Sequence, residues 1–213
     1  MKTRTLAALA ILPFLALAAF GSGHDLDRSD PARTPKVTVH KNQRMLVVMA
    51  KGDPEKAGDA AMKILFREFF RNATEAEKNA PIAPRVRWTI SAPDVRKKDW
   101  IGKYALPVSA DFPETDGGGT VIEEWRYGLT AELLHIGKSA AKPASIEILK
   151  GYIARNGFAI AGDFEEEYIQ GKATFFEGRP EDYRTLLRFP IMGIHDFPKI
   201  STPLTSAPRM APE

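Results

Sequence analysis

Two stretches of helical periodicity recur at a fixed distance along the chain. In each stretch, three apolar residues follow the spacing of one buried helix face. The first set is Met62, Leu65 and Phe69, and the second is Ile146, Leu149 and Ile153. Each member of the second set lies 84 residues after its counterpart. A constant offset of this kind predicts an internal duplication, so the domain is expected to consist of two related halves.

Strand-like runs surround both predicted helices in the same order. One run precedes each helix and ends in a glycine turn, and two more runs follow it. In the first half the runs are 45–49, 86–90 and 104–108, and in the second half they are 131–136, 164–169 and 187–191. The predicted fold class is therefore α+β. Two pseudo-symmetric βαββ units form one antiparallel sheet, with the helices on one side and a ligand groove between the halves.

The ends of the two helices carry recognisable signals. Asp53-Pro54 places an N-cap acceptor before a proline that fits the first helical position. The second helix is predicted to begin at Pro143 and to stop at Asn156-Gly157, where glycine can adopt a left-handed conformation. The sequence therefore marks the start of the first helix and both ends of the second.

The N-terminus has the layout of a secretory signal peptide. Lys2 and Arg4 precede an uncharged apolar run from residue 6 to residue 20, which is short for a membrane-spanning helix. We expect residues 1–21 to be the signal peptide, with cleavage after Gly21 and a periplasmic or secreted mature protein. The alternative is an uncleaved segment that anchors the chain in a membrane.

Proline and polar residues mark the edges of the predicted domain. Residues 22–39 are expected to form a flexible linker, and residues 198–213, with four prolines, a tail. The domain between them spans residues 40–197, with halves of about 40–114 and 120–197 joined by a glycine-containing loop. We expect a monomer.

Composition excludes several classes of site. The chain has no cysteine, so disulfides, thiol nucleophiles and thiolate metal sites are absent. Removal of residues 1–21 takes away two cations and no acids, so the net charge falls from +3 to +1, and no nucleic-acid partner is expected. Gly137-Lys138-Ser139 lacks the earlier glycine of a phosphate-binding loop, because that position is Glu132. The four histidines lack close spacing, so neither a metal nor another cofactor is predicted.

The strand at 164–169 carries the strongest candidate site. Alternation places Phe164, Glu166 and Tyr168 on one face, and Glu165, Glu167 and Ile169 on the other. A carboxylate between two aromatic rings suits planar or cationic organic molecules. In the alternative interpretation the glutamates line a solvated strand edge and Tyr168 belongs to the core.

Four further aromatic residues are candidates for the groove. They are Trp88, Trp100, Tyr104 and Trp125, and they lie on predicted strand segments. A single tryptophan is more often a core residue than a pocket residue. Because the chain has three, we expect at least one of them to line the groove.

The second half resembles the GyrI-like small-molecule-binding domain, the effector-binding module of AraC- and MerR-type multidrug regulators with an SHS2-type duplicated βαββ fold. The resemblance rests on 133–137 (LLHIG), 156–158 (NGF), 166–169 (EEYI) and 185–191 (TLLRFPI), and more loosely on 51–54 (KGDP) and 100–108. It implies a groove between two βαββ units, with Glu166 as its carboxylate and Tyr168 two residues later. The chain departs from the pattern at Lys138-Ser139 and at 170–174, and Phe175 and Phe176 follow in that loop.

Three functions are consistent with these features. The leading hypothesis is an exported binding protein for planar, hydrophobic or cationic organic ligands, without chemistry of its own. An alternative is a hydrolase of electrophilic, strained-ring natural products, in which Glu166 activates water and Tyr168 donates a proton. A further alternative is a tetrapyrrole binder of the SOUL type with His135 as axial ligand, although a hydrogen-bonded structural role at the strand end is the preferred interpretation of His135.

Overall fold

The computed structural model describes residues 33–90, 95–115, 118–171, 174 and 178–194, which belong to one compact unit spanning Pro31–Glu213. Several predicted features lie outside the described residues. They are the signal peptide, most of the linker, the proline-containing tail, Phe175 and Phe176. Among the described residues, no helix has the length and apolar character needed to cross a bilayer.

The described chain folds into antiparallel strands and a few helices. The strands are β1 (Lys36–His40), β2 (Gln43–Lys51), β3 (Arg85–Ile90), β4 (Ile101–Pro107), β5 (Val121–Trp125), β6 (Gly128–Ile136), β7 (Phe158–Ile160), β8 (Phe164–Gln170) and β9 (Arg184–Gly193). The α-helices are α1 (Pro54–Asn72), α2 (Glu75–Asn79) and α3 (Lys142–Arg155), and a short 3-10 turn, Ser139–Ala141, precedes α3. All six predicted strands and both predicted long helices are confirmed.

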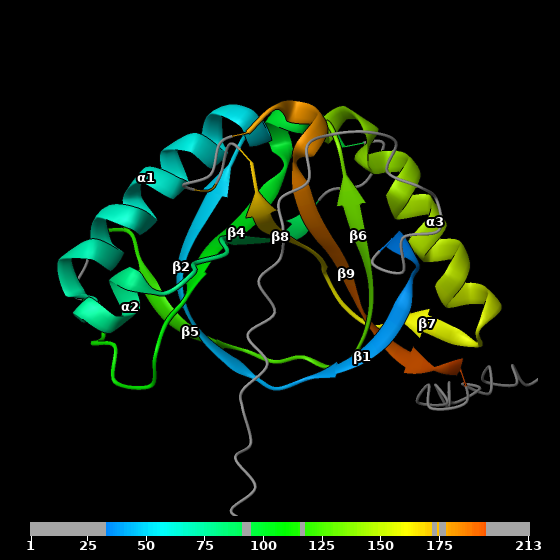
Figure 1. Ribbon diagram of the computed structural model, residues 1–213, viewed down its shortest axis with the longest axis horizontal. Helices are drawn as coiled ribbons and strands as arrows, with labels where there is room; N and C mark the ends of the chain where they lie inside the picture. Colours follow the sequence, from blue (N-terminus) through cyan, green and yellow to red (C-terminus); the bar gives the residue numbers. More distant parts are fainter. Residues whose placement is uncertain (1–32, 91–94, 116–117, 172–173, 175–177, 195–213) are drawn as a thin grey trace, which may run out of the picture. The chain divides into compact units, whose positions relative to one another are not determined.

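The strands form one curled sheet in the order β1-β6-β9-β8-β3-β4-β2-β5, and β7 pairs with β9 (Figure 1). Counted outward from the middle of this order, strands of the two halves match: β8 with β3, β9 with β4, and β6 with β2. The middle pair is β8 and β3, with Val86 opposite Glu166 and Trp88 opposite Phe164. The pseudo-twofold relation of the halves in space stays a prediction.

The helices α1 and α3 lie on the same side of the sheet, α1 over the first half and α3 over the second (Figure 1). The backbone carbonyl of Asp53 accepts hydrogen bonds from the N–H groups of Lys56 and Ala57, so α1 begins where the sequence indicates. At the end of α3, Gly157 has a φ of 73°, which a side chain would make unfavourable.

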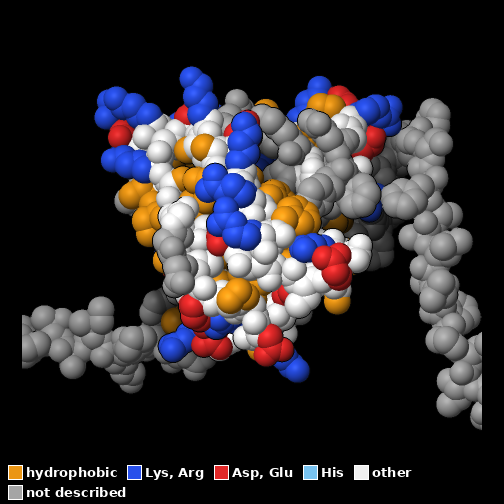
Figure 2. Space-filling model, turned by 90° about the vertical axis from the view of Figure 1, so that its left-hand side faces the viewer, with side chains coloured by type: hydrophobic (Ala, Val, Ile, Leu, Met, Phe, Trp, Pro, Cys, Tyr) orange, Lys and Arg blue, Asp and Glu red, His pale blue; other side chains and the backbone are white. Residues whose placement is uncertain are grey.

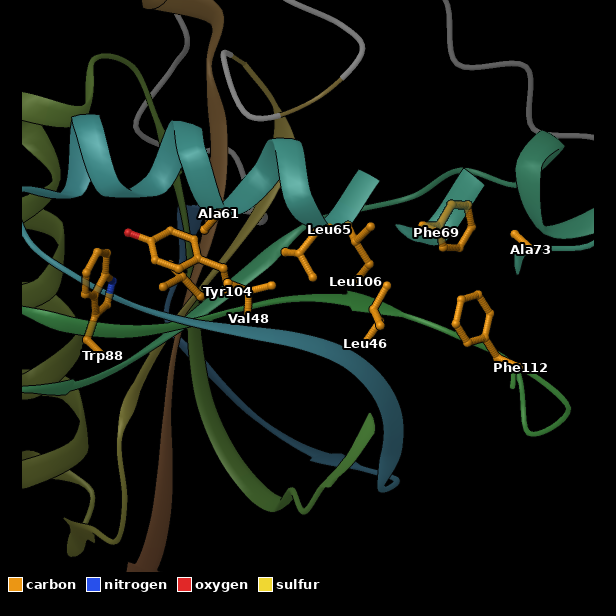
Figure 3. Packing of buried hydrophobic residues seen from close by; sticks show 11 residues of the cluster. Leu46, Val48, Ala61, Leu65, Phe69, Ala73, Trp88, Tyr104, Leu106 and Phe112 are labelled. Atoms are coloured by element: carbon orange, nitrogen blue, oxygen red, sulfur yellow. The ribbon is translucent and has the colours of Figure 1, made fainter. Parts of the chain in front are cut away.

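The hydrophobic core beneath α1 is the largest apolar cluster. Leu65 and Phe69 of α1 are almost fully buried against Leu46 of β2 and Leu106 of β4. Figure 3 shows these side chains in a row, with Trp88 and Tyr104 at one end and Phe112 at the other. The aromatic candidates of the first half are therefore continuous with the core.

A second cluster lies beneath α3. Leu149 and Ile153 of α3 pack on Leu133, Leu187 and further residues of β6 and β9. Phe164 packs against both this cluster and the one beneath α1. The strand β8 therefore joins the two halves of the core on the helix side of the sheet.

The outer surface over α1 keeps some apolar side chains accessible. Figure 2 shows this side, where Lys and Arg side chains stand among hydrophobic ones. Phe70 of α1 is exposed, and its ring stacks on Phe66 at 6.2 Å between centroids.

Candidate functional site

The strand β8 presents two different sets of side chains, one on each face of the sheet. Phe164, Glu166 and Tyr168 lie on the helix side, where Phe164 and Tyr168 pack against the core cluster of α1. Glu165 and Glu167 point to the opposite side, where arginines bind them. This alternation agrees with the sequence prediction and brings Glu166 to the region between α1 and α3.

Glu166 is buried and pairs with Lys142, the first residue of α3. The side chains of Glu166 and Lys142 are 7% and 13% exposed, and the lysine Nζ donates a hydrogen bond to Oε2 of the glutamate. The ammonium group also lies 5.5 Å from the centroid of the Tyr168 ring, within the range of a cation–π interaction. The carboxylate of the candidate site therefore has a counter-ion from the chain itself.

Two tyrosines share the electrostatic surroundings of Glu166. Burial, together with the negative charges of Glu166, Asp53 and Asp59, raises the pKa of Tyr104 to about 12. Burial and the Glu166 carboxylate raise the pKa of Tyr168 well above its ordinary value. Both hydroxyl groups are therefore protonated at neutral pH and can donate a hydrogen bond.

Trp88, Trp100 and Tyr104 form an aromatic cluster on β3 and β4. The Trp88 ring lies edge-on to Trp100 at 5.4 Å and to Tyr104 at 5.9 Å between centroids. Gly102 permits this packing, because a Cβ there would lie 3.1 Å from the side chains of Trp88, Tyr104 and Val86. Five of the six predicted aromatic site residues, the three of this cluster with Phe164 and Tyr168, therefore belong to one contiguous region.

The indole nitrogens of this cluster differ. Nε1 of Trp100 donates a hydrogen bond of 2.9 Å to the carbonyl of Val95. Nε1 of Trp88 is buried and has no hydrogen-bond partner among the described residues. An unpaired buried donor costs free energy. The indole N–H of Trp88 can therefore still donate one hydrogen bond.

Trp125, the remaining predicted site residue, lies apart from this region. It is buried with Met45, Val47 and Ala105, which alternate with the residues that face α1 and so lie on the opposite side of the sheet. The guanidinium of Arg87 stacks over its ring at 4.1 Å. The structure therefore does not bring Trp125 together with Glu166.

His135 has both ring nitrogens engaged in hydrogen bonds. Nδ1 lies 2.9 Å from Oγ of Ser145, and Nε2 lies 3.2 Å from the carbonyl of Lys138. Because the carbonyl can only accept, Nε2 carries the proton and Nδ1 accepts from the serine hydroxyl. Burial, with the positive charge of Lys142, lowers the pKa of His135. This arrangement matches the structural role that the sequence favours and leaves no ring nitrogen free for axial ligation.

The opposite face of the sheet holds a buried network of charges. Arg188 of β9 binds Glu132, Glu165 and Glu167, while Arg87 of β3 pairs with Glu165 at 2.8 Å. Every one of these side chains is at most 16% exposed. Because these charges satisfy one another inside the protein, we interpret this face as structural.

The likeness of this chain to known proteins lies in its three-dimensional structure. No protein-family model and no curated protein matches the sequence. Solved structures do match, and the three described below are 14–16% identical to this chain. An uncharacterised conserved protein from Listeria innocua superimposes with a TM-score of 0.59 at 15% identity, over 76% of this chain and 94% of the other.

Two further solved structures share the arrangement. The C-terminal domain of EcmrR matches with a TM-score of 0.62 at 14% identity, over 75% of this chain and 98% of that domain. A hydrolase from Listeria innocua matches with a TM-score of 0.57 at 16% identity, over 77% and 94%. The chain has a GyrI-like fold. In this GyrI-like fold, Glu166 lies on the strand next to the middle of the sheet and faces the helices.

Lys142 is the residue of the candidate site that sequence reasoning missed. A signal was present, because Lys142 stands directly before Pro143 at a helix start. The positive end of the helix dipole makes a cation unfavourable there. An unfavourable cation at the start of a helix suggests an acidic partner elsewhere in the fold, but the sequence alone does not identify Glu166 as that partner.

Two cavities of the described structure lie away from Glu166. One of about 410 Å³ is lined by Arg87, Tyr127, Asp163 and residues near the end of β9, and another of about 610 Å³ lies around Arg44 and Glu124. Neither is lined by Glu166 or Tyr168. The groove expected beside Glu166 stays a prediction.

Proposed function

We propose that this chain is an exported small-molecule-binding protein that takes planar organic ligands on the helix side of the sheet, at Glu166 and the neighbouring aromatic rings. The observation that carries the proposal is the position of Glu166. A buried carboxylate lies at the seam of the two halves, among Phe164, Tyr168 and Tyr104. A carboxylate at this position places a charged group among rings that a planar ligand can contact.

The aromatic residues supply the surface that a planar ligand requires. Phe164, Tyr168 and Trp100 keep part of their surface accessible, whereas Trp88 and Tyr104 support them from within the core. Stacking on such rings contributes on the order of 0.5–1.5 kcal/mol per pair beyond the area that is buried. Several rings together therefore provide useful affinity without a catalytic group.

A hydrolase is the second candidate function. One protein of the same fold is described as a hydrolase, and Tyr168 is a protonated hydroxyl beside the Glu166 carboxylate. Such a pair can position water and donate a proton to a leaving group. Glu166→Gln separates the two functions, because turnover would collapse in a hydrolase while neutral ligands would still bind.

Export is part of the proposal and rests on residues 1–21. A periplasmic or secreted binding protein would sequester or sense its ligand outside the cytoplasm. Mass spectrometry of the protein from the producing cells tests this point. A mature N-terminus near residue 22 is expected, and an intact N-terminus would contradict cleavage.

Tryptophan fluorescence gives a direct test of ligand binding, because Trp88 and Trp100 lie at the site and Trp125 does not. A planar ligand should quench the fluorescence of the wild-type protein. The quenching should persist in Trp125→Phe and disappear in the double variant Trp88→Phe/Trp100→Phe. Quenching that depends on Trp125 alone would place the ligand on the opposite side of the sheet.

Ligand discovery can start from what co-purifies with the protein. Compounds identified by mass spectrometry are then titrated in thermal unfolding experiments. A ligand at one hundred times its dissociation constant adds about 2.7 kcal/mol to the free energy of unfolding. A Glu166→Gln variant that retains the full shift for every ligand would argue against Glu166 as a binding residue.

A further inference from the structure

The ion pair between Lys142 and Glu166 sets the charge of the candidate site. The two side chains are 13% and 7% exposed, so water screens them weakly. Their charges cancel, and the site as a whole does not offer the free carboxylate that attracts a cation. A cationic ligand would instead meet the ammonium group of Lys142, and like charges in a poorly solvated site repel each other.

The position of Lys142 is unfavourable for α3 itself. It is the first residue of the helix, where the helix dipole disfavours a positive charge, and the first turn has no acidic residue to compensate. The ammonium is held instead by Glu166 and by the face of the Tyr168 ring at 5.5 Å. The contacts with Glu166 and Tyr168, rather than the helix, therefore hold this lysine in place.

The ammonium also has hydrogen-bonding capacity beyond the ion pair. A lysine ammonium carries three N–H donors, and Glu166 is its one hydrogen-bond acceptor among the described residues. The buried Nε1 of Trp88 is a further donor without a partner in the described structure. The donors at this site outnumber its acceptors, which suits a ligand that brings an acceptor of its own.

Resting on the proposed function, we propose that Lys142 is a specificity-determining residue. It makes the site selective for neutral, planar aromatic compounds with a hydrogen-bond acceptor, and it excludes organic cations. The pairing of Lys142 with Glu166 thus reverses the preference that the carboxylate alone would give.

Acridine and N-methylacridinium form a matched pair of probes. At slightly alkaline pH acridine is uncharged and has a free ring nitrogen, while the N-methyl compound has the same rings and a permanent positive charge. Titration of the purified protein, followed by tryptophan quenching and calorimetry, gives both dissociation constants. The wild-type protein should bind acridine at least about tenfold more tightly than N-methylacridinium. A tenfold difference in dissociation constant corresponds to about 1.4 kcal/mol.

Lys142→Met should reverse this preference by weakening acridine and strengthening N-methylacridinium. Lys150→Met is the matched control, because Lys150 lies on the same helix and pairs with Glu147 at the surface. It should keep the wild-type ratio. Lys142→Met/Glu166→Gln removes both charges without leaving a lone buried acid, so it tests the same point if the single variant unfolds. This double variant should bind the two probes about equally.

The outcomes separate the two proposals. If the wild-type protein prefers the cation, or if loss of Lys142 leaves the ratio of the two dissociation constants unchanged, the role of Lys142 is overturned and the binding function stands. If neither probe binds to any folded variant while ligands that co-purify do bind elsewhere, the proposed site itself is overturned.

Discussion

Arg188 and Glu165 form a direct ion pair inside the domain, on the side of the sheet away from the helices. Nη1 of the arginine donates to Oε1 of the glutamate at 3.0 Å, and the two side chains are 7% and 2% exposed. The same guanidinium also binds Glu132 and Glu167. One buried cation therefore neutralises part of the charge of three carboxylates from two different strands.

Replacement of Arg188 by methionine is expected to destabilise the protein by about 3–5 kcal/mol, because three buried acids lose a partner at once. Arg179→Met is the control, since its pair with Asp182 is largely exposed and should contribute less than about 1 kcal/mol. Urea denaturation of both variants gives the comparison. Equal losses in the two variants would contradict the importance of the buried network.

Glu77 should make the stability of α2 dependent on pH. Burial alone would raise its pKa, but hydrogen bonds from Thr74 and Ser109 outweigh burial and lower the pKa to about 2. Because the folded-state pKa is below the ordinary value of 4.5, the stabilisation is complete above that value. It is lost as the pH falls from about 4.5 to about 2.

The variant Glu77→Gln is neutral throughout and should remove this part of the acid sensitivity. Glutamine also serves in a capping box, so the expected loss at neutral pH is only about 1 kcal/mol. Glu75→Gln, on the same helix, should leave the loss of stability at acid pH as it is in the wild-type protein. An unchanged loss at acid pH in Glu77→Gln would show that other carboxylates dominate.

Gly102→Ala should disturb the aromatic cluster beside the candidate site. The added Cβ would lie 3.1 Å from Trp88, Tyr104 and Val86, so the side chains must move. We expect a loss of about 1–3 kcal/mol and a shift of the tryptophan emission. Thermal unfolding and fluorescence spectra provide the measurement.

Gly151→Ala is the matched control for glycine replacement. Gly151 lies within α3, and the nearest group to an added Cβ is the mobile end of Arg155. Alanine is the better helix former, so a gain of about 0.5–1 kcal/mol is expected. A loss as large as that of Gly102→Ala would mean that crowding at Gly102 is not specific to the aromatic cluster.

Lys142 and Glu166 should be strongly coupled in stability as well as in binding. Lys142→Met leaves a buried carboxylate without a counter-ion and should cost about 3–5 kcal/mol. The double variant with Glu166→Gln should recover most of that loss, because no lone buried charge remains. A double-mutant cycle measured by urea denaturation tests this, and simple additivity of the two single losses would contradict the coupling.

The sequence alone determined the repeated order of strand, helix, strand and strand. Helix and strand periods and their end signals are local properties, so the start of α1 at Pro54 and the side of β8 that Glu166 occupies could be predicted. The edge strand β1 and the short β7 were not predicted, because they depend on pairing with strands already in place. Their own residues carry only weak local signals.

Tertiary structure alone decided the partners of the candidate site. Lys142 precedes Glu166 by 24 residues and meets it only because α3 packs over the sheet. Trp125 is as aromatic as Trp88, yet strand register places it on the opposite side, under Arg87. Periodicity predicts on which face of its helix or strand a residue lies. Which residue it contacts there depends on packing between distant segments, and no local sequence pattern encodes that packing.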